Sequence, residues 1–498
     1  MLREPLAIPL REARPPLVLA LDIGTSGLRV FIFDSRARPI ARCIAHSERP
    51  VHTSPDGEVT VDADESVRAV YAAIDAVLAC AGRRAGEIEA VAVSTFWHSL
   101  LGVDDRGRPT TRVLTWADTR ARAAAAALRR ELDPGATHAR TGCVLHASYL
   151  PAKLRWLREH DAQAYARTKW WMSLGEYLYQ RISGARRAAH GMASATGLYD
   201  QRARRWDRPL LSHLQVEEQM LSPIDDQPLV GMRPAFLRRW PALARARWVP
   251  AIGDGACSNL GAGAVGRNIA ALFLGTSGAI RVVYASDDPP VVPGGWTYRV
   301  DSSRVIAGGA LSNGGNLLAW VGRTFPGVDL ARSVRGVPLD GSLIALPLLA
   351  GDRSPTWNDA ARAAVAGIGL GTSAEDIARA LVEGVAYRVG RLWALTSTAL
   401  PGINRVIATG GTLLARPWLM QLFADAIDRP LVVSLAGDGS ARGAAMFALE
   451  RLGTVPDSMA IRSPTGRAFR PRPEVTERLQ AGIGRQRELE EALAPLMS

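Results

Sequence analysis

Two stretches of the chain share one pattern of apolar and polar positions. In residues 17–34, LVLALDIGTSGLRVFIFD, an apolar run leads into the turn Gly-Thr-Ser-Gly, and β-branched and aromatic residues resume directly after Gly27. This order predicts a strand, a tight turn and a second strand, because no helical period begins after the turn. Residues 269–284, IAALFLGTSGAIRVVY, repeat the pattern without an acidic residue before the turn. We therefore expect two related β-hairpins, one in each half of the chain.

Other segments show the periods of helices and buried strands. In the first half we expect helices at 59–81 and 116–132, a buried strand at 88–96, and a helical stretch rich in Trp and Tyr at 148–183. In the second half we expect an amphipathic helix at 374–395, a strand–turn–helix unit at 405–427, a strand at 429–434 and a helix at 439–453. The pattern predicts two α/β domains, 15–258 and 259–452, each opening with the same hairpin, and a polar helical tail at 453–498.

Length and composition agree with a globular protein of two domains. At 498 residues the chain is too long for one ordinary core, and its content is 47% hydrophobic and 22% charged residues. No window reaches the roughly 18 uncharged apolar residues of a membrane span, so we expect no membrane role. Charges on both sides of the first apolar segment indicate a leader strand rather than a secretion signal. The cysteines stand alone without metal-binding spacing, which indicates a reducing cytoplasm; they are Cys43, Cys80, Cys143 and Cys257.

The formal net charge of +12 raises the question of a nucleic-acid partner. Of the 60 basic residues only Lys153 and Lys169 are lysines, and the arginines are scattered among alanines without a run of five or more like charges. We therefore expect no nucleic-acid binding, although a basic surface favours anionic ligands such as nucleotides and sugar acids. Neither lysine follows a glycine, which excludes a P-loop. The Gly-x-Gly-x-x-Gly match at 261–266 precedes a strand, so it does not predict a dinucleotide site.

The two Gly-Thr-Ser-Gly turns are candidate phosphate sites. Such a turn presents backbone N–H groups and hydroxyls in a small concave nest that suits phosphate oxygens. Either turn alone could be an ordinary hairpin, but one in each domain could hold a polyphosphate from both sides of a cleft. The phosphate-binding candidates are Gly24, Thr25, Ser26, Gly275, Thr276 and Ser277. Asp22, present only in the first copy, is the candidate ligand for one Mg²⁺ ion, reached through water.

Several motifs occur in the order found in one kinase family. LDIGTSGLRVFIFD, LTWADTR, GDGACSNLGAG, LFLGTSGA and ATGGTLLARPWLMQLFADAIDRPL, spread over residues 17–450, resemble the motifs of FGGY-family carbohydrate kinases in the actin/Hsp70/sugar-kinase superfamily. The resemblance implies an α/β fold of two ribonuclease H-like (actin-like ATPase) domains with a catalytic cleft between them. It also implies ATP and Mg²⁺ as cofactors, a sugar or sugar acid as acceptor, and a homodimer as one possible assembly.

Three segments are more similar to gluconokinases than to other members of that family. They are WHSL at 97–100, HGMASATGLYD at 190–200 and the Asp-Gly-x-x-Ser-Asn-Leu-Gly run at 254–261. Xylulokinase-like members typically have His-Gly at the positions of 98–99 and Asp-Asn at those of 254–255. The resemblance therefore implies phosphorylation of D-gluconate to 6-phosphogluconate. A kinase of a pentulose or other polyol is the alternative, and a non-catalytic ATP switch or sugar sensor is an alternative of another class.

Asp254 is the candidate catalytic base, because phosphoryl transfer needs a group that takes the proton of the acceptor hydroxyl. We expect it in a Gly-rich turn between the domains, where it would also contact the substrate. Trp97 and His98 follow a strand at the edge where α/β proteins bind ligands, and His98 is expected to donate to a sugar hydroxyl or carboxylate. The presence of both Asp22 and Asp254 argues against a pure sensor, since a sensor needs no base.

The segment TWADTR adds three candidate substrate contacts. Trp116 would form the floor of the pocket, Asp118 would accept from sugar hydroxyls, and Arg120 would pair with Asp118 or meet a gluconate carboxylate. Asp118 could instead cap a helix that begins near residue 119. The family motifs imply further nucleotide contacts at Gly308, Gly309, Asn313, Gly410 and Gly411. For the last two glycines, a tight strand–helix turn is the alternative.

Overall fold

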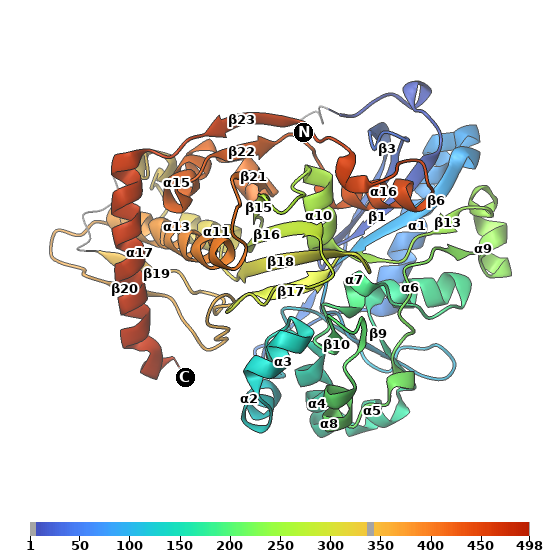
Figure 1. Cartoon of the computed structure of the whole chain (residues 1–498), viewed down its shortest axis with the longest axis horizontal. Coiled ribbons are helices and arrows are strands. Elements are labelled where there is room, and N and C mark those ends of the chain that lie inside the picture. The colour runs from blue at the N-terminus through green and yellow to red at the C-terminus, as the bar shows by residue number, and fades with distance from the viewer. Residues whose placement is uncertain (1–5, 336–342, 498) are drawn as a thin grey trace.

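Each Gly-Thr-Ser-Gly turn joins two antiparallel strands in the middle of its own sheet, which confirms both predicted hairpins. The first pair is β1 (Leu17–Ile23) and β2 (Gly27–Phe33), and the second is β15 (Ile269–Leu274) and β16 (Gly278–Ala285). The computed structural model describes residues 6–335 and 343–497. In Figure 1 the two sheets lie beside each other, with the first hairpin coloured blue and the second sheet running from yellow to red.

The first sheet places its hairpin between an antiparallel strand on one side and parallel strands on the other. Its order is β12 (Leu229–Val230), β13 (Arg247–Trp248), β6 (Ile88–Thr95), β1, β2 and β3 (Pro39–Glu48), with β14 (Ile252–Gly253) also paired to β6. β6 runs parallel to β1 and confirms the buried strand expected at 88–96. Helix α1 (Ala63–Ala81) packs against β2 and β3, and α6 (Leu174–Ser183) packs against α1 and β6.

The second sheet repeats the topology of the first. Its order is β17 (Trp296–Arg299), β18 (Arg304–Leu311), β16, β15, β21 (Arg405–Thr409), β22 (Leu431–Ser434) and β23 (Thr465–Phe469). The run β18-β16-β15-β21-β22 has the same strand directions as β3-β2-β1-β6-β13. Its helices are α11 (Gly315–Thr324), α13 (Ala374–Ala399), α14 (Gly411–Leu414), α15 (Pro417–Ile427) and α17 (Pro473–Leu493). The fold is thus the two-part α/β architecture expected from the resemblance.

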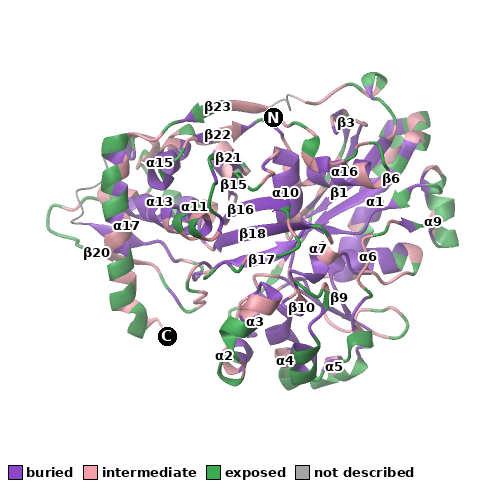
Figure 2. Cartoon of the chain, in the orientation of Figure 1, coloured by how far each residue is buried: buried purple, intermediate pink, exposed green. Residues whose placement is uncertain are grey.

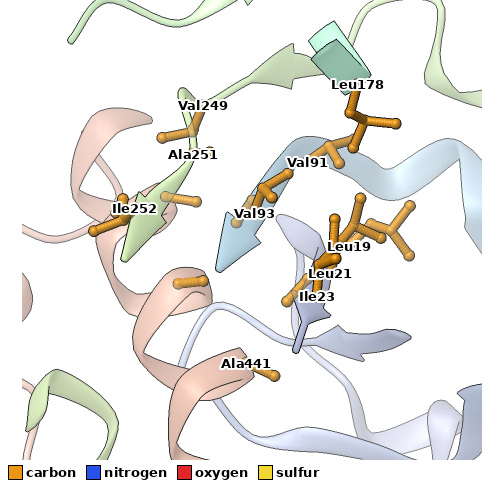
Figure 3. Close-up of a cluster of buried hydrophobic side chains, with 14 of the residues drawn as sticks. Leu19, Leu21, Ile23, Val91, Val93, Leu178, Val249, Ala251, Ile252 and Ala441 are labelled. Atoms are coloured by element: carbon orange, nitrogen blue, oxygen red, sulfur yellow. The ribbon is translucent and has the colours of Figure 1, made fainter. Parts of the chain in front are cut away.

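Helix α16 (Gly439–Arg451) is distant in sequence from the first sheet but packs on it. It contacts β1, β6 and α10 (Asp254–Ala262). Figure 3 shows its Ala441 in the same buried apolar cluster as Leu21, Val93 and Ile252. In Figure 2 the central strands β1, β16 and β18 and the helices α10 and α16 are largely buried, while β23 and α17 expose much of their surface. The proposed domain boundary after residue 258 falls within α10, which α16 contacts.

The remaining elements form a lobe and short connections. The lobe, at the bottom of Figure 1, contains α2 (Arg122–Glu131), α3 (Pro134–Thr141), α4 (Leu150–His160), α5 (Ala162–Arg167) and α8 (Arg208–Leu214). The short elements are β4 (His52–Thr53), β5 (Val59–Val61), β7 (Leu101–Val103), β8 (Val113–Leu114), β9 (Trp170–Met172), β10 (Tyr199–Asp200), β11 (Arg205–Trp206), β19 (Ile344–Leu346), β20 (Ala364–Ala366), α7 (His190–Ala193), α9 (Pro234–Arg239) and α12 (Leu330–Ser333). Within the described ranges, no helix has the length and apolar character needed to cross a bilayer.

Three of the expected helices differ from the structure. The stretch 148–183 is not one helix, because β9 interrupts it and the side chains of Asp161 and Ser173 cap new helices by accepting from backbone N–H groups. The helix expected at 59–81 starts only with α1, since its β-branched first residues form β5. The helix expected at 116–132 starts only with α2.

Cys43 on β3 and Cys80 on α1 form a disulfide, with their Cα atoms 5.4 Å apart. The expectation that every cysteine stands alone is therefore wrong. The two residues are 37 positions apart, and only the packing of α1 against β3 brings them together. Cys143 and Cys257 are free and buried.

Candidate active site

A cavity of about 490 Å³ lies between the two halves of the chain, and both Gly-Thr-Ser-Gly turns reach its wall. The first half contributes six residues expected at a site: Thr25, Ser26, Trp97, His98, Trp116 and Asp254. The second half contributes the expected Thr276 and Ser277. The fold therefore gathers hydroxyls, aromatic rings and one carboxylate from distant parts of the sequence into one concave site.

Arg49 forms hydrogen bonds to the backbone carbonyl oxygens of the first turn. Its Nη2 donates to the carbonyl oxygen of Thr25 at 2.8 Å and to that of Gly24, and its backbone N–H donates to the carbonyl oxygen of Ser26 at 2.9 Å. Burial lowers the pKa of Arg49 to about 10, so the guanidinium stays charged at neutral pH. Carbonyl oxygens would repel a phosphate group. Arg49 binds the carbonyl oxygens of this turn, and Thr25 and Ser26 line the cavity.

The backbone at the start of α11 holds the second turn in the same manner. The N–H of Gly315 donates to the carbonyl oxygen of Gly275 at 2.9 Å, and the N–H of Asn316 donates to that of Thr276 at 3.1 Å. A Cβ on Gly315 would lie 2.5 Å from the Gly275 carbonyl oxygen and 2.7 Å from Thr412 Oγ1. The turn, the start of α11 and the segment beginning α14 therefore converge at one edge of the cavity.

Asp254 is the first residue of α10, not part of the expected turn. Its Oδ1 accepts from the N–H of Gly255 at 2.7 Å. A Cβ on Gly253 or Gly255 would collide with the Trp97 ring, so the glycines on both sides of Asp254 let that ring pack against the helix start. Burial raises the pKa of Asp254 to about 6, against the opposing charge of Arg281. A carboxylate with this pKa is ionised at neutral pH and is a stronger base than an ordinary aspartate.

His98 lies on the cavity wall with a defined tautomer. Its Nδ1 lies 2.6 Å from the carbonyl oxygen of Ala195, which can only accept, so Nδ1 carries the proton. Burial lowers the pKa of His98 to about 3, which keeps the ring neutral at neutral pH. Its Nε2 is therefore an acceptor for a sugar hydroxyl, rather than the donor that the sequence predicts.

Trp116 and His98 are held from behind by one buried lysine. Lys153 Nζ donates to the carbonyl oxygen of His98 at 2.6 Å and to that of Thr115 at 2.7 Å. Trp116, the next residue, donates from Nε1 to Thr25 Oγ1 at 3.2 Å. The ring that was expected to form the floor of the pocket therefore also contacts the first turn.

Asp118 and Arg120 pair with each other and are not among the residues that line the cavity. Arg120 Nη2 donates to Asp118 Oδ2 at 2.7 Å, and Arg120 Nε donates to Asp118 Oδ1 at 3.1 Å. Asp118 also accepts from the N–H of Val59, and Arg120 Nη1 lies 3.5 Å from a carboxylate oxygen of Glu58. The N-cap of α2 is Ala121, so Asp118 does not cap that helix. These partners account for both side chains without a ligand.

Asp22 forms an ion pair with Arg29. Arg29 Nη2 donates to its Oδ2 at 2.6 Å, Ser94 Oγ donates to its Oδ1 at 3.1 Å, and Arg29 also pairs with Asp438. Burial raises the pKa of Asp22 in spite of Arg29. No group of three or more His, Cys, Asp or Glu in residues 6–335 and 343–497 could hold a metal ion. A single carboxylate that reaches Mg²⁺ through water needs no such group, so the Mg²⁺ role of Asp22 stays a prediction.

Gly308 and Gly309 lie inside β18 and have a packing role. A Cβ on Gly308 would collide with the carbonyl oxygen of Ile280, and a Cβ on Gly309 would collide with a side chain of α13. Asn313 closes a neighbouring loop, since its amide bonds to the backbone at 350–351 with distances of 3.0 and 2.9 Å. None of these three lines the cavity among the described residues, and their nucleotide role stays a prediction.

The glycine pair that opens α14 lies beside the second turn. Gly410 has a φ of 90° and packs so closely on Leu274, the residue before Gly275, that a Cβ would collide with it. Gly410 is therefore explained by a tight strand–helix turn. A Cβ on Gly411 would meet no other described atom within 4 Å, so this glycine is open to a ligand, and its nucleotide role stays a prediction.

Two arginines on the cavity wall were missed by the sequence analysis. Arg281 lies on β16, two residues after Ala279 and hence on the same face of the strand, and Arg353 lies in the loop between β19 and β20. Burial lowers the pKa of Arg281 to about 10 and also lowers that of Arg353. A charged residue within the apolar strand GAIRVVY was the available signal.

Comparison with known proteins finds one family that matches both halves of the chain. The N-terminal domain of the FGGY family of carbohydrate kinases matches residues 17–229, and the C-terminal domain of the same family matches residues 270–450. The chain belongs to the FGGY family. This FGGY kinase is 26% identical to the gluconokinase of Bacillus subtilis over 486 residues, which are 92% of this chain and 91% of that relative. It is 27% identical to the glycerol kinase of Rhodospirillum centenum over 469 residues, 89% of this chain and 91% of that relative.

Solved structures confirm the fold of this FGGY kinase. A gluconate kinase from Lactobacillus acidophilus superposes with a TM-score of 0.89 at 23% identity, covering 96% of this chain and 98% of that one. A xylulose kinase from the same organism superposes with a TM-score of 0.87 at 24% identity and the same coverage. Identities this low establish the shared architecture and do not select a substrate.

Proposed function

We propose that this FGGY kinase transfers the γ-phosphoryl group of ATP to a terminal hydroxyl of D-gluconate, which yields 6-phosphogluconate and ADP. The observation that carries the proposal is the position of Asp254, whose carboxylate lies in the same cavity as the hydroxyls of both turns. A triphosphate held by Thr25, Ser26, Thr276 and Ser277 would present its terminal phosphate to an acceptor beside that carboxylate.

The chemistry of this cavity suits phosphoryl transfer. Asp254 accepts the proton of the acceptor hydroxyl as that oxygen bonds to the γ-phosphorus, and the bond from the γ-phosphorus to the bridging oxygen of ADP breaks. Helices α10 and α16 both begin at the cavity, where Gly255 and Ser440 line it, and helix N-termini attract anions. Closure of the two halves would exclude water and prevent wasteful hydrolysis of ATP.

Two observations favour D-gluconate over a neutral sugar: the positive charge of the cavity wall and the similarity to gluconate kinases. The cavity wall carries the cationic side chains Arg281 and Arg353 beside its aromatic rings, and these cations suit an anionic acceptor. The gluconokinase of Bacillus subtilis and the gluconate kinase of Lactobacillus acidophilus are among the similar proteins. Xylulose and glycerol kinases are also similar, so a neutral polyol is the alternative substrate class. A homodimer stays a prediction. A cytoplasmic location also stays a prediction, but the Cys43–Cys80 disulfide removes the cysteine argument for it.

A panel of acceptors tests the proposal. ADP formation is followed in a coupled assay at fixed Mg–ATP with D-gluconate, D-xylulose or glycerol, and without any acceptor. We expect the highest kcat/KM for D-gluconate, and a phosphorylated product at its terminal hydroxyl. A higher kcat/KM for xylulose or glycerol would assign the alternative substrate class. ATP turnover that no acceptor changes would point instead to an ATP switch.

A further inference from the structure

Two guanidinium groups in the cavity have no part in the proton transfer assigned to Asp254. Arg281 and Arg353 both line the cavity, and their charges lie close enough for Arg353 to affect the titration of Arg281. Arg281 packs over the ring of Phe273, and Arg353 packs over the ring of Trp116. Two like charges brought together and withdrawn from water are unfavourable. The carboxylate of Asp254 offsets part of the Arg281 charge, and a further anion between the two guanidinium groups would offset more of it.

Several donors of these two side chains lack partners. Nε and Nη2 of Arg281, and Nε of Arg353, are shielded from solvent and form no hydrogen bond to any part of the chain that the structure describes. Arg353 is anchored by one bond, from Nη2 to the carbonyl oxygen of Leu311 at 2.6 Å. Buried donors without partners are rare in native proteins, and at a cavity wall they indicate a ligand that supplies acceptors.

The unpaired edge of Arg281 is the edge with which other arginines of this protein bind carboxylates. Arg120 holds Asp118 through Nε and Nη2 at 3.1 and 2.7 Å. Arg239 holds Asp75 through the same two atoms at 3.2 and 2.6 Å. In Arg281 neither of these atoms has a hydrogen-bond partner among the described residues. A carboxylate is therefore the group that matches the free edge in both geometry and charge.

We propose that Arg281 and Arg353 together bind the carboxylate of the substrate and so make this kinase specific for sugar acids. This inference rests on the proposed function and names the residues that select its substrate class. It transfers to Arg281 and Arg353 the role that the sequence offered for Arg120, whose guanidinium is already paired. Arg281 follows Ser277 by four positions, about 13 Å along an extended strand, which separates it from the phosphate-binding turn.

Direct binding without ATP tests the assignment. Tryptophan fluorescence serves as the probe, since Trp97, Trp116, Trp296 and Trp357 line the cavity. The ligands are D-gluconate and D-glucitol, which differ in the carboxylate. We expect Arg281→Gln and Arg353→Gln each to weaken gluconate binding by about 10- to 100-fold and to leave glucitol binding within about twofold. The matched control is Arg267→Gln, because Arg267 is exposed and packs over Tyr284 outside the cavity.

The outcomes separate this inference from the proposed function. Equal weakening of both ligands, or no change for either, would overturn the carboxylate assignment. An increase in the KM of ATP with unchanged gluconate binding would assign Arg281 to phosphate and would also overturn it. Arg281→Lys keeps the charge without the fork and is expected to recover only part of the gluconate affinity, so it remains informative if the Gln variant folds poorly. Wild-type protein that binds gluconate through these arginines but never phosphorylates it would contradict the proposed function alone.

Discussion

Lys153 holds His98 from behind the cavity, with its Nζ 2.6 Å from the carbonyl oxygen of that residue. A second bond reaches the carbonyl oxygen of Thr115, directly before Trp116. Burial lowers the pKa of Lys153 to about 7, and even the neutral amine has two N–H donors for these two acceptors. One buried side chain thus fixes two separate segments of the cavity wall.

Replacing Lys153 should loosen both segments. We expect Lys153→Met to lower the free energy of unfolding by about 2–4 kcal/mol, because it leaves two buried carbonyl oxygens without donors, and to raise the KM of the acceptor more than that of ATP. Urea unfolding and steady-state kinetics measure these effects. Lys169→Met is the matched control, since Lys169 is exposed and is the only other lysine of the chain. Equal stability of the two variants would contradict the assigned role.

The pH dependence of the reaction should report Asp254. Since burial raises the pKa of Asp254 to about 6, its carboxylate is ionised and able to act as a base above that pH, and it is protonated below it. We therefore expect kcat/KM for the acceptor to be level above about pH 7 and to fall about tenfold per unit below pH 6. Circular dichroism at each pH checks that the fold persists. Activity that stays level down to pH 4.5 would exclude Asp254 as the base.

The same carboxylate should cost stability at neutral pH. A pKa raised from 3.8 to about 6 in the folded state means that the native protein holds this proton more tightly than the unfolded chain. The ionised form therefore destabilises the fold above about pH 6, and the effect disappears below pH 3.8. We expect Asp254→Asn to raise the free energy of unfolding by about 1–3 kcal/mol at pH 8, with no gain near pH 4. A variant less stable than wild type at pH 8 would contradict this account.

The Cys43–Cys80 disulfide should stabilise the first half of the chain without affecting chemistry. It links residues 37 positions apart, and closing such a loop in the unfolded chain stabilises the native state by about 3–4 kcal/mol. We expect a reductant to lower the Tm of the wild type while kcat stays unchanged, because neither cysteine lines the cavity. Cys43→Ser should remove the response to reductant, and Cys143→Ser, at a free cysteine, should retain it. A Tm that ignores the reductant would contradict a stabilising bond.

The sequence predicted the elements that local patterns determine. Both hairpins follow from a short turn between β-branched runs, and the buried strand at 88–96 follows from its apolar run. The position of α16 could not be predicted in this way, because its place on the first sheet depends on packing between segments more than 150 residues apart, such as α10 and α16.

In the candidate site, too, local sequence patterns revealed some residues and contacts formed only in the fold decided others. Thr25 and Thr276 were recognised because the motif Gly-Thr-Ser-Gly is repeated. Asp254 was recognised because it lies in a Gly-rich segment before the second copy and matches a family motif, and all three residues reach the cavity. Arg120 was expected to meet a carboxylate, but its neighbour Asp118 already occupies it. Arg281 was missed, because a strand sequence does not reveal which face meets a cavity formed with the other half of the molecule. Three-dimensional contacts, with near neighbours as well as with distant segments, thus decide which charged side chains can meet a ligand.

The rate at which wild type and Asp254→Asn convert D-gluconate and Mg–ATP to 6-phosphogluconate and ADP tests the central claim most directly. We predict gluconate-dependent turnover by the wild type, and a kcat lower by about 100-fold or more in the variant, with similar affinities for both substrates. Formation of 6-phosphogluconate by Asp254→Asn at a rate near that of the wild type would contradict it.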